Sequence, residues 1–148
     1  MTAITLTFSI TIQASQRAVF EYLSDWERQS DWIMFTTVKQ LPGATSPRAV
    51  NLLAITKFGP IKLIDTMVIT DWQPCERIAV EHTGRVILGK GVFSVKHLSD
   101  DSCLFTWQEI TPVPFGLIGK LGLFFFQPLI RLPFQSSLRK LKHKIEST

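Results

Sequence analysis

The sequence predicts an α+β domain in which seven antiparallel strands form a sheet curved around a long C-terminal helix, with two short helices after the first strand. Segments rich in β-branched and aromatic residues follow one another at short intervals between residues 35 and 111. The breaks between them are too short for parallel crossovers, so successive strands should pair antiparallel. A long apolar segment of helical periodicity then closes the chain and can cover the sheet.

The first strand and the two short helices are expected within residues 1–33. "MTAITLTFSITIQ" alternates between apolar and polar residues, as a half-buried strand does. Ser15 can cap a helix over "QRAVFEYL", where Val19, Phe20 and Leu23 form an apolar stripe. Asp25 can cap a second helix, "WERQSDWI", whose two tryptophans we interpret as core anchors.

Six further strands are expected, separated by turns such as "LPGATSP", "KFGPI", "WQPCE", "HTGR" and "LSDDS". In several strands, apolar residues occupy both odd and even positions and so lie on both faces of the sheet, which indicates a curved sheet that is covered on one side. Their expected bounds are residues 35–41, 49–57, 61–72, 77–82, 90–98 and 103–111.

The final helical region begins with an apolar stretch, "VPFGLIGKLGLFFFQPLIRLPFQ", that looks at first like a membrane span. Lys120, Gln127 and Arg131 interrupt it, and a span needs about 20 predominantly apolar residues. The segment is therefore expected to be amphipathic and to lie on the concave face of the sheet. Pro128 and Pro133 should kink or break it, and at least one of the phenylalanines at 124–126 should be exposed.

Length and composition indicate a single domain over residues 1–148. The 148 residues are 45% apolar and 19% charged, which suits a globular chain with a sizeable core. The start of the chain lacks the continuous apolar block of a secretory signal, so we expect a cytoplasmic protein. Cys75 and Cys103 have no CxxC or metal-ligand spacing and are expected to be free thiols.

The net charge of +4 is unevenly distributed. From residue 113 onward, six Lys or Arg residues stand against Glu146 alone. Such a basic, Phe-rich region can attract anionic lipid or nucleic acid, or it can be a solvated helix face. We expect no nucleic-acid partner, and we keep transient contact with an anionic membrane surface as a hypothesis that would make the protein peripheral to the membrane.

Three stretches carry a resemblance to a known superfamily. They are "SITIQASQRAVFEYLSDWERQSDW", "VITDWQPCERIAV" and "CLFTWQEITPVPFGLIG". In the first, Ala14, Val19, Phe20, Asp25 and Trp32 match the typical opening of a strand, a small residue, a helix with Val and Phe, and Asp followed by Trp. The chain resembles the START-like or SRPBCC superfamily over nearly its whole length, including its polyketide cyclase/dehydrase and ligand-transport branches.

The resemblance implies a helix-grip fold with an apolar cavity between the sheet and the C-terminal helix. Members of this superfamily bind lipids, sterols, quinones, polyketides or other hydrophobic molecules, and some catalyse cyclisation or dehydration in the cavity. The tail "LFFFQPLIRLP" departs from many members because it is unusually apolar and carries two prolines, which puts a straight helical lid in doubt.

Strand parity assigns a set of side chains to the concave, cavity-facing side of the sheet. From the C-terminal segment we add residues expected to face the same cavity: Leu117, Leu121, Phe124, Phe125 and Leu129. The strand residues are Asp65, Met67, Ile69, Ile78, Val80, His82, Phe93, Val95, Phe105, Trp107 and Glu109.

Asp65, His82 and Glu109 are the polar members of this set. A carboxyl group in an apolar cleft can act as an acid or a base, and histidine titrates near neutrality, so Glu109 and His82 are the candidate catalytic pair. The alternatives stay open: His82 can lie at a wet strand end, Asp65 can point outward, and Glu109 can be paired for structural reasons. Because no metal-ligand, phosphate-binding or dinucleotide motif is present, we expect neither a metal site nor a cofactor.

Two functions follow from these observations. The leading hypothesis is a noncatalytic carrier or sensor of a hydrophobic small molecule, such as a lipid, a polyketide or a quinone-like compound. The alternative is a cyclase or dehydratase of the aromatic polyketide type that uses Glu109 and His82. Ligand identity and oligomeric state are left open by the sequence.

Overall fold

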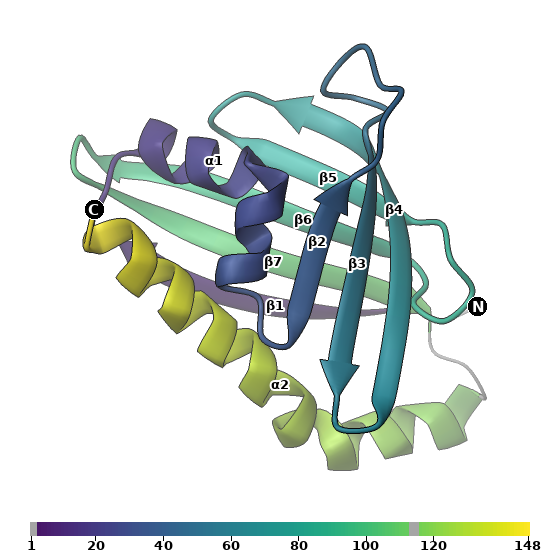
Figure 1. Cartoon of the computed structure of the whole chain (residues 1–148). Coiled ribbons are helices and arrows are strands. Elements are labelled where there is room, and N and C mark those ends of the chain that lie inside the picture. The colour runs from purple at the N-terminus through teal and green to yellow at the C-terminus, as the bar shows by residue number, and fades with distance from the viewer. Residues whose placement is uncertain (1–2, 113–115) are drawn as a thin grey trace.

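The computed structural model describes residues 3–112 and 116–148; within the last helix the side chains of residues 116–118, 120, 123 and 126 are not described. One sheet wraps around one long helix, and two short helices lie over the end of the sheet that is away from the start of that helix (Figure 1). The elements in chain order are β1 (Ala3–Ile12), α1 (Gln16–Ser24), η1 (Trp26–Asp31), β2 (Thr36–Gln40), β3 (Asn51–Phe58), β4 (Ile61–Gln73), β5 (Arg77–His82), β6 (Lys90–Ser99), β7 (Ser102–Pro112) and α2 (Gly116–Glu146).

The seven strands form one antiparallel sheet in the order β1-β7-β6-β5-β4-β3-β2. From β2 to β7 each strand pairs with the next along the chain, and β1 closes the order by pairing with β7. The predicted α+β class and antiparallel meander are confirmed. The register shifts between Ile69 and Asp71, and such a bulge bends the strand and strengthens its twist.

The two short helices begin where the sequence predicted, but they differ in kind. In α1 the Ala18 N–H donates to Ser15 Oγ at 3.1 Å, which is the predicted cap. The second is a 3₁₀ helix, and Asp25 forms an ion pair with Arg28 at 3.3 Å instead of capping it. Trp32 is fully buried and Trp26 nearly so, in agreement with their expected place in the core.

The second half of α2 packs on β1 and closes the core. Leu138, Leu141 and Ile145 are buried at helical spacing, and the ring of Phe134 stacks on that of Phe8 at 4.6 Å. Cys103 is buried here, and both cysteines are free thiols.

The sequence predicted a kink or a break at the two prolines; both lie inside one continuous helix, so no break occurs. The helix changes direction between its light-green first part and its yellow second part (Figure 1). The Ser137 hydroxyl donates to the Pro133 carbonyl at 2.7 Å and accepts the Met34 N–H at 2.9 Å. These bonds tie the helix to the start of β2 beside the second proline.

Candidate functional site

A cavity of about 470 Å³ lies between the concave face of the sheet and the second half of α2. Its lining is mostly apolar, with residues from the sheet, η1, α2 and the loop between β5 and β6. This volume and lining are typical of a site for a hydrophobic small molecule.

Most of the strand residues assigned by parity line this cavity. Ile69, Val95 and Phe105 lie on the same face but are buried in the core, because α1 and the last turns of α2 close that end of the sheet. The strand residues that line the cavity are Asp65, Met67, Ile78, Val80, His82, Phe93, Trp107 and Glu109.

The helix residues assigned to the cavity do not line it. Leu121, Phe124, Phe125 and Leu129 are exposed on the surface, and the side chain of Leu117 lies outside the described residues. The first part of α2 turns away from β1 (Figure 1), and these four side chains are left uncovered there. The helical cover comes from the middle of α2, through Ile130, Pro133, Phe134 and Ser137.

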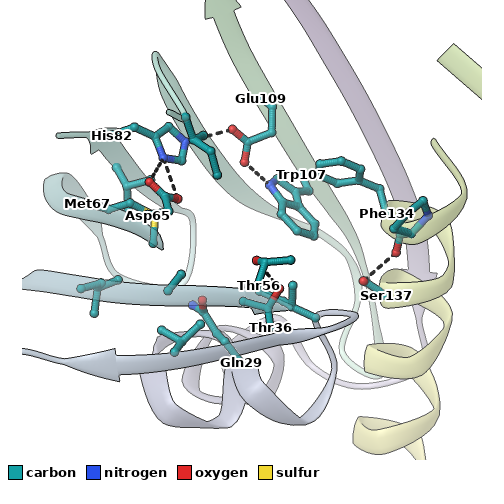
Figure 2. Close-up of a pocket in the computed structure, with 18 of the residues that line it drawn as sticks. Gln29, Thr36, Thr56, Asp65, Met67, His82, Trp107, Glu109, Phe134 and Ser137 are labelled. Carbon is teal, nitrogen blue, oxygen red and sulfur yellow. Dashed lines mark hydrogen bonds and ion pairs between the residues drawn. The ribbon is translucent and has the colours of Figure 1, made fainter. Parts of the chain in front are cut away.

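The three polar side chains meet in one hydrogen-bonded chain at one side of the cavity (Figure 2). His82 Nδ1 lies 2.9 Å from both oxygens of Asp65, and His82 Nε2 lies 3.2 Å from Glu109 Oε2. The Trp107 indole N–H donates to Glu109 Oε1 at 2.8 Å. Only 5% of the His82 side chain is exposed, so it is not at a wet strand end.

Sheet register explains how residues so far apart in sequence meet. Met67 pairs with His82 across β4 and β5, which places Asp65 diagonally beside the histidine. Glu109 is two strands away on β7, opposite Gly91 on β6. A Cβ at Gly91 would lie 3.1 Å from Glu109 Oε1, so the glycine leaves the space through which Glu109 reaches His82.

The surroundings of His82 keep it positively charged at neutral pH. Burial lowers the pKa of His82, but its hydrogen bonds to Asp65 and Glu109 and the charges of these two groups outweigh burial and raise the pKa from 6.5 to about 9. Both ring nitrogens therefore carry protons, and each donates to a carboxylate. The chain is an imidazolium held between two acids.

A second polar group lies across the cavity, on β2 and β3. The hydroxyls of Thr36 and Thr56 are 2.9 Å apart, and the Thr36 hydroxyl also donates to the Met34 carbonyl at 2.9 Å (Figure 2). Thr56 then donates to Thr36 and keeps an acceptor site. Two separate places in an apolar cavity can therefore fix the polar atoms of a ligand.

Toward a ligand, the hydrogen-bonded chain of Asp65, His82 and Glu109 can mainly accept hydrogen bonds. The two ring N–H groups of His82 and the indole N–H of Trp107 already donate to Asp65 and Glu109. A carboxylate offers about four acceptor positions, so each acid keeps some unused. Among the residues that the structure describes, no group of three His, Cys, Asp or Glu side chains is arranged to hold a metal ion.

Several cavity residues escaped the sequence reasoning. Gln29 lies on the 3₁₀ helix η1 and Ser137 on α2, where strand alternation does not apply. Thr36 and Thr56 lie on β2 and β3, and the alternation of Leu52, Ala54 and Thr56 along β3 was a signal that could have placed Thr56 in the cavity. Gly91 did carry a signal, because a glycine inside a strand often marks the close approach of another group.

The fold is shared with solved structures of low sequence identity. An aromatase/cyclase, ZhuI from Streptomyces sp. R1128, matches with a TM-score of 0.80 at 12% identity, covering 98% of this chain and 94% of that one. A START superfamily protein from Mycobacterium smegmatis matches with a TM-score of 0.71 at 16% identity, covering 97% of each chain.

A third structure is the di-domain aromatase/cyclase StfQ of the steffimycin biosynthetic pathway, with a TM-score of 0.75 at 11% identity over 98% of this chain and 51% of that one. At these identities the likeness shows the fold alone. No curated protein matches the sequence.

A family model settles the relationship at the level of sequence. The model described as polyketide cyclase / dehydrase and lipid transport matches residues 3–146, nearly the whole chain. The expected START-like resemblance is confirmed: the chain belongs to the polyketide cyclase / dehydrase and lipid transport family of the START-like superfamily.

Proposed function

We propose that this protein is a carrier or sensor of a neutral hydrophobic molecule that bears a hydroxyl group. The observation that carries the proposal is the Asp65–His82–Glu109 chain inside an otherwise mostly apolar cavity. Apolar walls favour a largely hydrocarbon or aromatic ligand, and the spare carboxylate positions favour a ligand that donates a hydrogen bond.

The charge of the site narrows the ligand class. Two carboxylates and one imidazolium carry a formal charge of −1 at pH 7. A ligand with its own carboxylate would bring a like charge into an apolar cavity, which is unfavourable. Sterols, phenols, reduced quinols and hydroxylated polyketides fit this site better than fatty acids or oxidised quinones.

Native mass spectrometry and solvent extraction of the purified protein test the proposal directly. We expect a co-purifying neutral compound, or saturable binding of a fluorescent sterol or phenol probe. Ala54→Phe places a ring in the cavity from β3 and should abolish binding. Ile55→Phe, on the same strand but outside the lining, is the matched control. Absence of both a bound compound and saturable binding would refute the proposal.

A cyclase or dehydratase is the second candidate, favoured by the meeting of Glu109 and His82 in one cavity. Against it, both ring protons of His82 already bond carboxylates, and both Glu109 oxygens accept hydrogen bonds, which makes them poor proton carriers toward a substrate. If catalysis occurs, Glu109→Gln should abolish turnover and keep ligand binding. Unchanged turnover in that variant would remove Glu109 from the mechanism.

A further inference from the structure

We propose that the mouth of the cavity docks on the surface of an anionic lipid bilayer. The docking surface, called the rim below, consists of the β3–β4 turn (residues 57–62), the β5–β6 loop (residues 83–90) and the first part of α2 (residues 116–132). The inference depends on the surface around the cavity and not on the identity of the ligand.

The three parts of the rim border one cavity. Leu63, just after the β3–β4 turn, lines it together with Leu88 of the β5–β6 loop and Ile130 of α2. Hydrogen bonds also link the turn to α2: the Lys57 N–H donates to the Phe35 carbonyl at 2.9 Å, and the N–H of Met34, the residue before Phe35, donates to the Ser137 hydroxyl of α2. In Figure 1 the β3–β4 turn and the first part of α2 lie at the same end of the molecule.

Large apolar side chains on the rim are exposed to solvent. Phe124 and Phe125 of α2 are 70% and 75% exposed, and Phe58 of the β3–β4 turn is 61% exposed. Leu129 and Val86 are exposed to a similar degree. Single exposed apolar residues are normal, but a group of them around one opening is typical of an interaction surface.

The backbone at Phe35 supports the same interpretation. Its φ is 63°, in the left-handed region that a bulky residue seldom adopts. Its ring is half exposed and meets the ring of Phe58 at 5.4 Å, edge to face. A strained backbone that presents an aromatic pair to solvent costs free energy in the isolated protein, and contact with an apolar phase would offset it.

All charged residues of the rim are basic. Its sequence contains no Asp or Glu, and it carries six cations: Lys57, Lys62, Arg85, Lys90, Lys120 and Arg131. Lys57 and Lys62 face each other directly across the β3–β4 hairpin, an arrangement that destabilises a sheet. Within the described part of the chain, neither lysine forms an ion pair.

The positive charge of the rim indicates which partner binds there. A second copy of the chain would set six cations against six cations, whereas an anionic lipid surface attracts them and receives the phenylalanines at its headgroup boundary. No helix in the described residues is long and apolar enough to cross a bilayer. The rim therefore fits contact with the interface, with the cavity opening toward the lipid.

Vesicle sedimentation tests the proposal, using phosphatidylcholine alone and phosphatidylcholine mixed with phosphatidylserine. We expect binding to the mixed vesicles only, weakening as salt is raised. Lys57→Glu with Lys62→Glu should lower the partition coefficient about thirtyfold or more, since each basic residue contributes about 1 kcal/mol. Phe124→Ser with Phe125→Ser should reduce it by at least about tenfold.

Matched controls lie away from the rim. Leu98→Ser removes an exposed leucine from the opposite end of β6, and Arg139→Glu with Lys140→Glu reverses two exposed cations on the second half of α2. Both should bind mixed vesicles like the natural sequence.

Three results would overturn the proposal: equal binding to both kinds of vesicle, equal losses in the control variants, or a dimer in sedimentation velocity that the Phe124 and Phe125 changes dissociate. None of them affects probe binding in the cavity measured without vesicles, so this inference and the proposed function can fail separately.

Discussion

The charge held on His82 predicts an unusual dependence of folding stability on pH. The pKa of this group is about 9 in the folded protein, against an ordinary value of 6.5 that applies to the unfolded chain. The folded state therefore binds the proton more tightly than the unfolded state does. The resulting stabilisation is complete below pH 6.5 and is lost as the pH rises through 9.

The size of the effect follows from the interval between the two pKa values. Each pH unit contributes about 1.4 kcal/mol, so the free energy of unfolding should fall by about 3 kcal/mol between pH 6.5 and pH 9. Only 5% of the side chain is exposed, so solvent screens the interaction little. A loss of this size is a large part of the stability of an ordinary domain.

Urea denaturation across this pH range, on the natural sequence and on His82→Gln, provides the assay. Glutamine offers an amide NH2 that can donate to a carboxylate but cannot titrate, so its curve should lack the 3 kcal/mol loss. The comparison also removes the contribution of Cys103, whose pKa burial raises. His97→Gln, at an exposed histidine, is the control and should follow the natural sequence. Parallel curves for the natural sequence and His82→Gln would refute the assignment of an imidazolium.

Three substitutions test the packing that supports the site. Gly91→Ala should push Glu109 away from His82 and lower the pKa of the histidine measured by NMR; an unchanged titration would show that the glycine is not needed. Ser137→Ala leaves the Met34 N–H without its partner and should cost about 1–3 kcal/mol in urea denaturation, whereas a neutral change would argue against this tie between α2 and β2. Leu141→Ala empties a fully buried position and should cost about 2–5 kcal/mol; a cost under about 1 kcal/mol would contradict its place in the core.

The fold was predictable because each element has local determinants. Turn residues separate the strands, their short connections force antiparallel pairing, and Ser15 marks the start of α1. All six later strands begin and end within two residues of their expected bounds.

The site was only partly predictable, because alternation along a strand assigns a face but not a neighbour. It placed Asp65, His82 and Glu109 on one face, yet the reach of Glu109 across β6 depends on the side chain missing at Gly91. Periodicity along α2 assigned the wrong half of the helix to the cavity. The sheet is too short to cover the whole helix, and helical spacing does not reveal where a partner surface ends.

The most direct test of the proposed function compares two ligands of which only one can donate a hydrogen bond. In isothermal titration, a long-chain alkylphenol is compared with its methyl ether, which keeps the ring and the alkyl chain and replaces the hydroxyl hydrogen by a methyl group. A hydrogen bond to a charged group contributes about 1.5–3 kcal/mol, so the phenol should bind about tenfold to a hundredfold more tightly. Equal affinity of the two compounds, or no saturable binding of either, would contradict recognition of a hydroxyl group by the Asp65–His82–Glu109 chain.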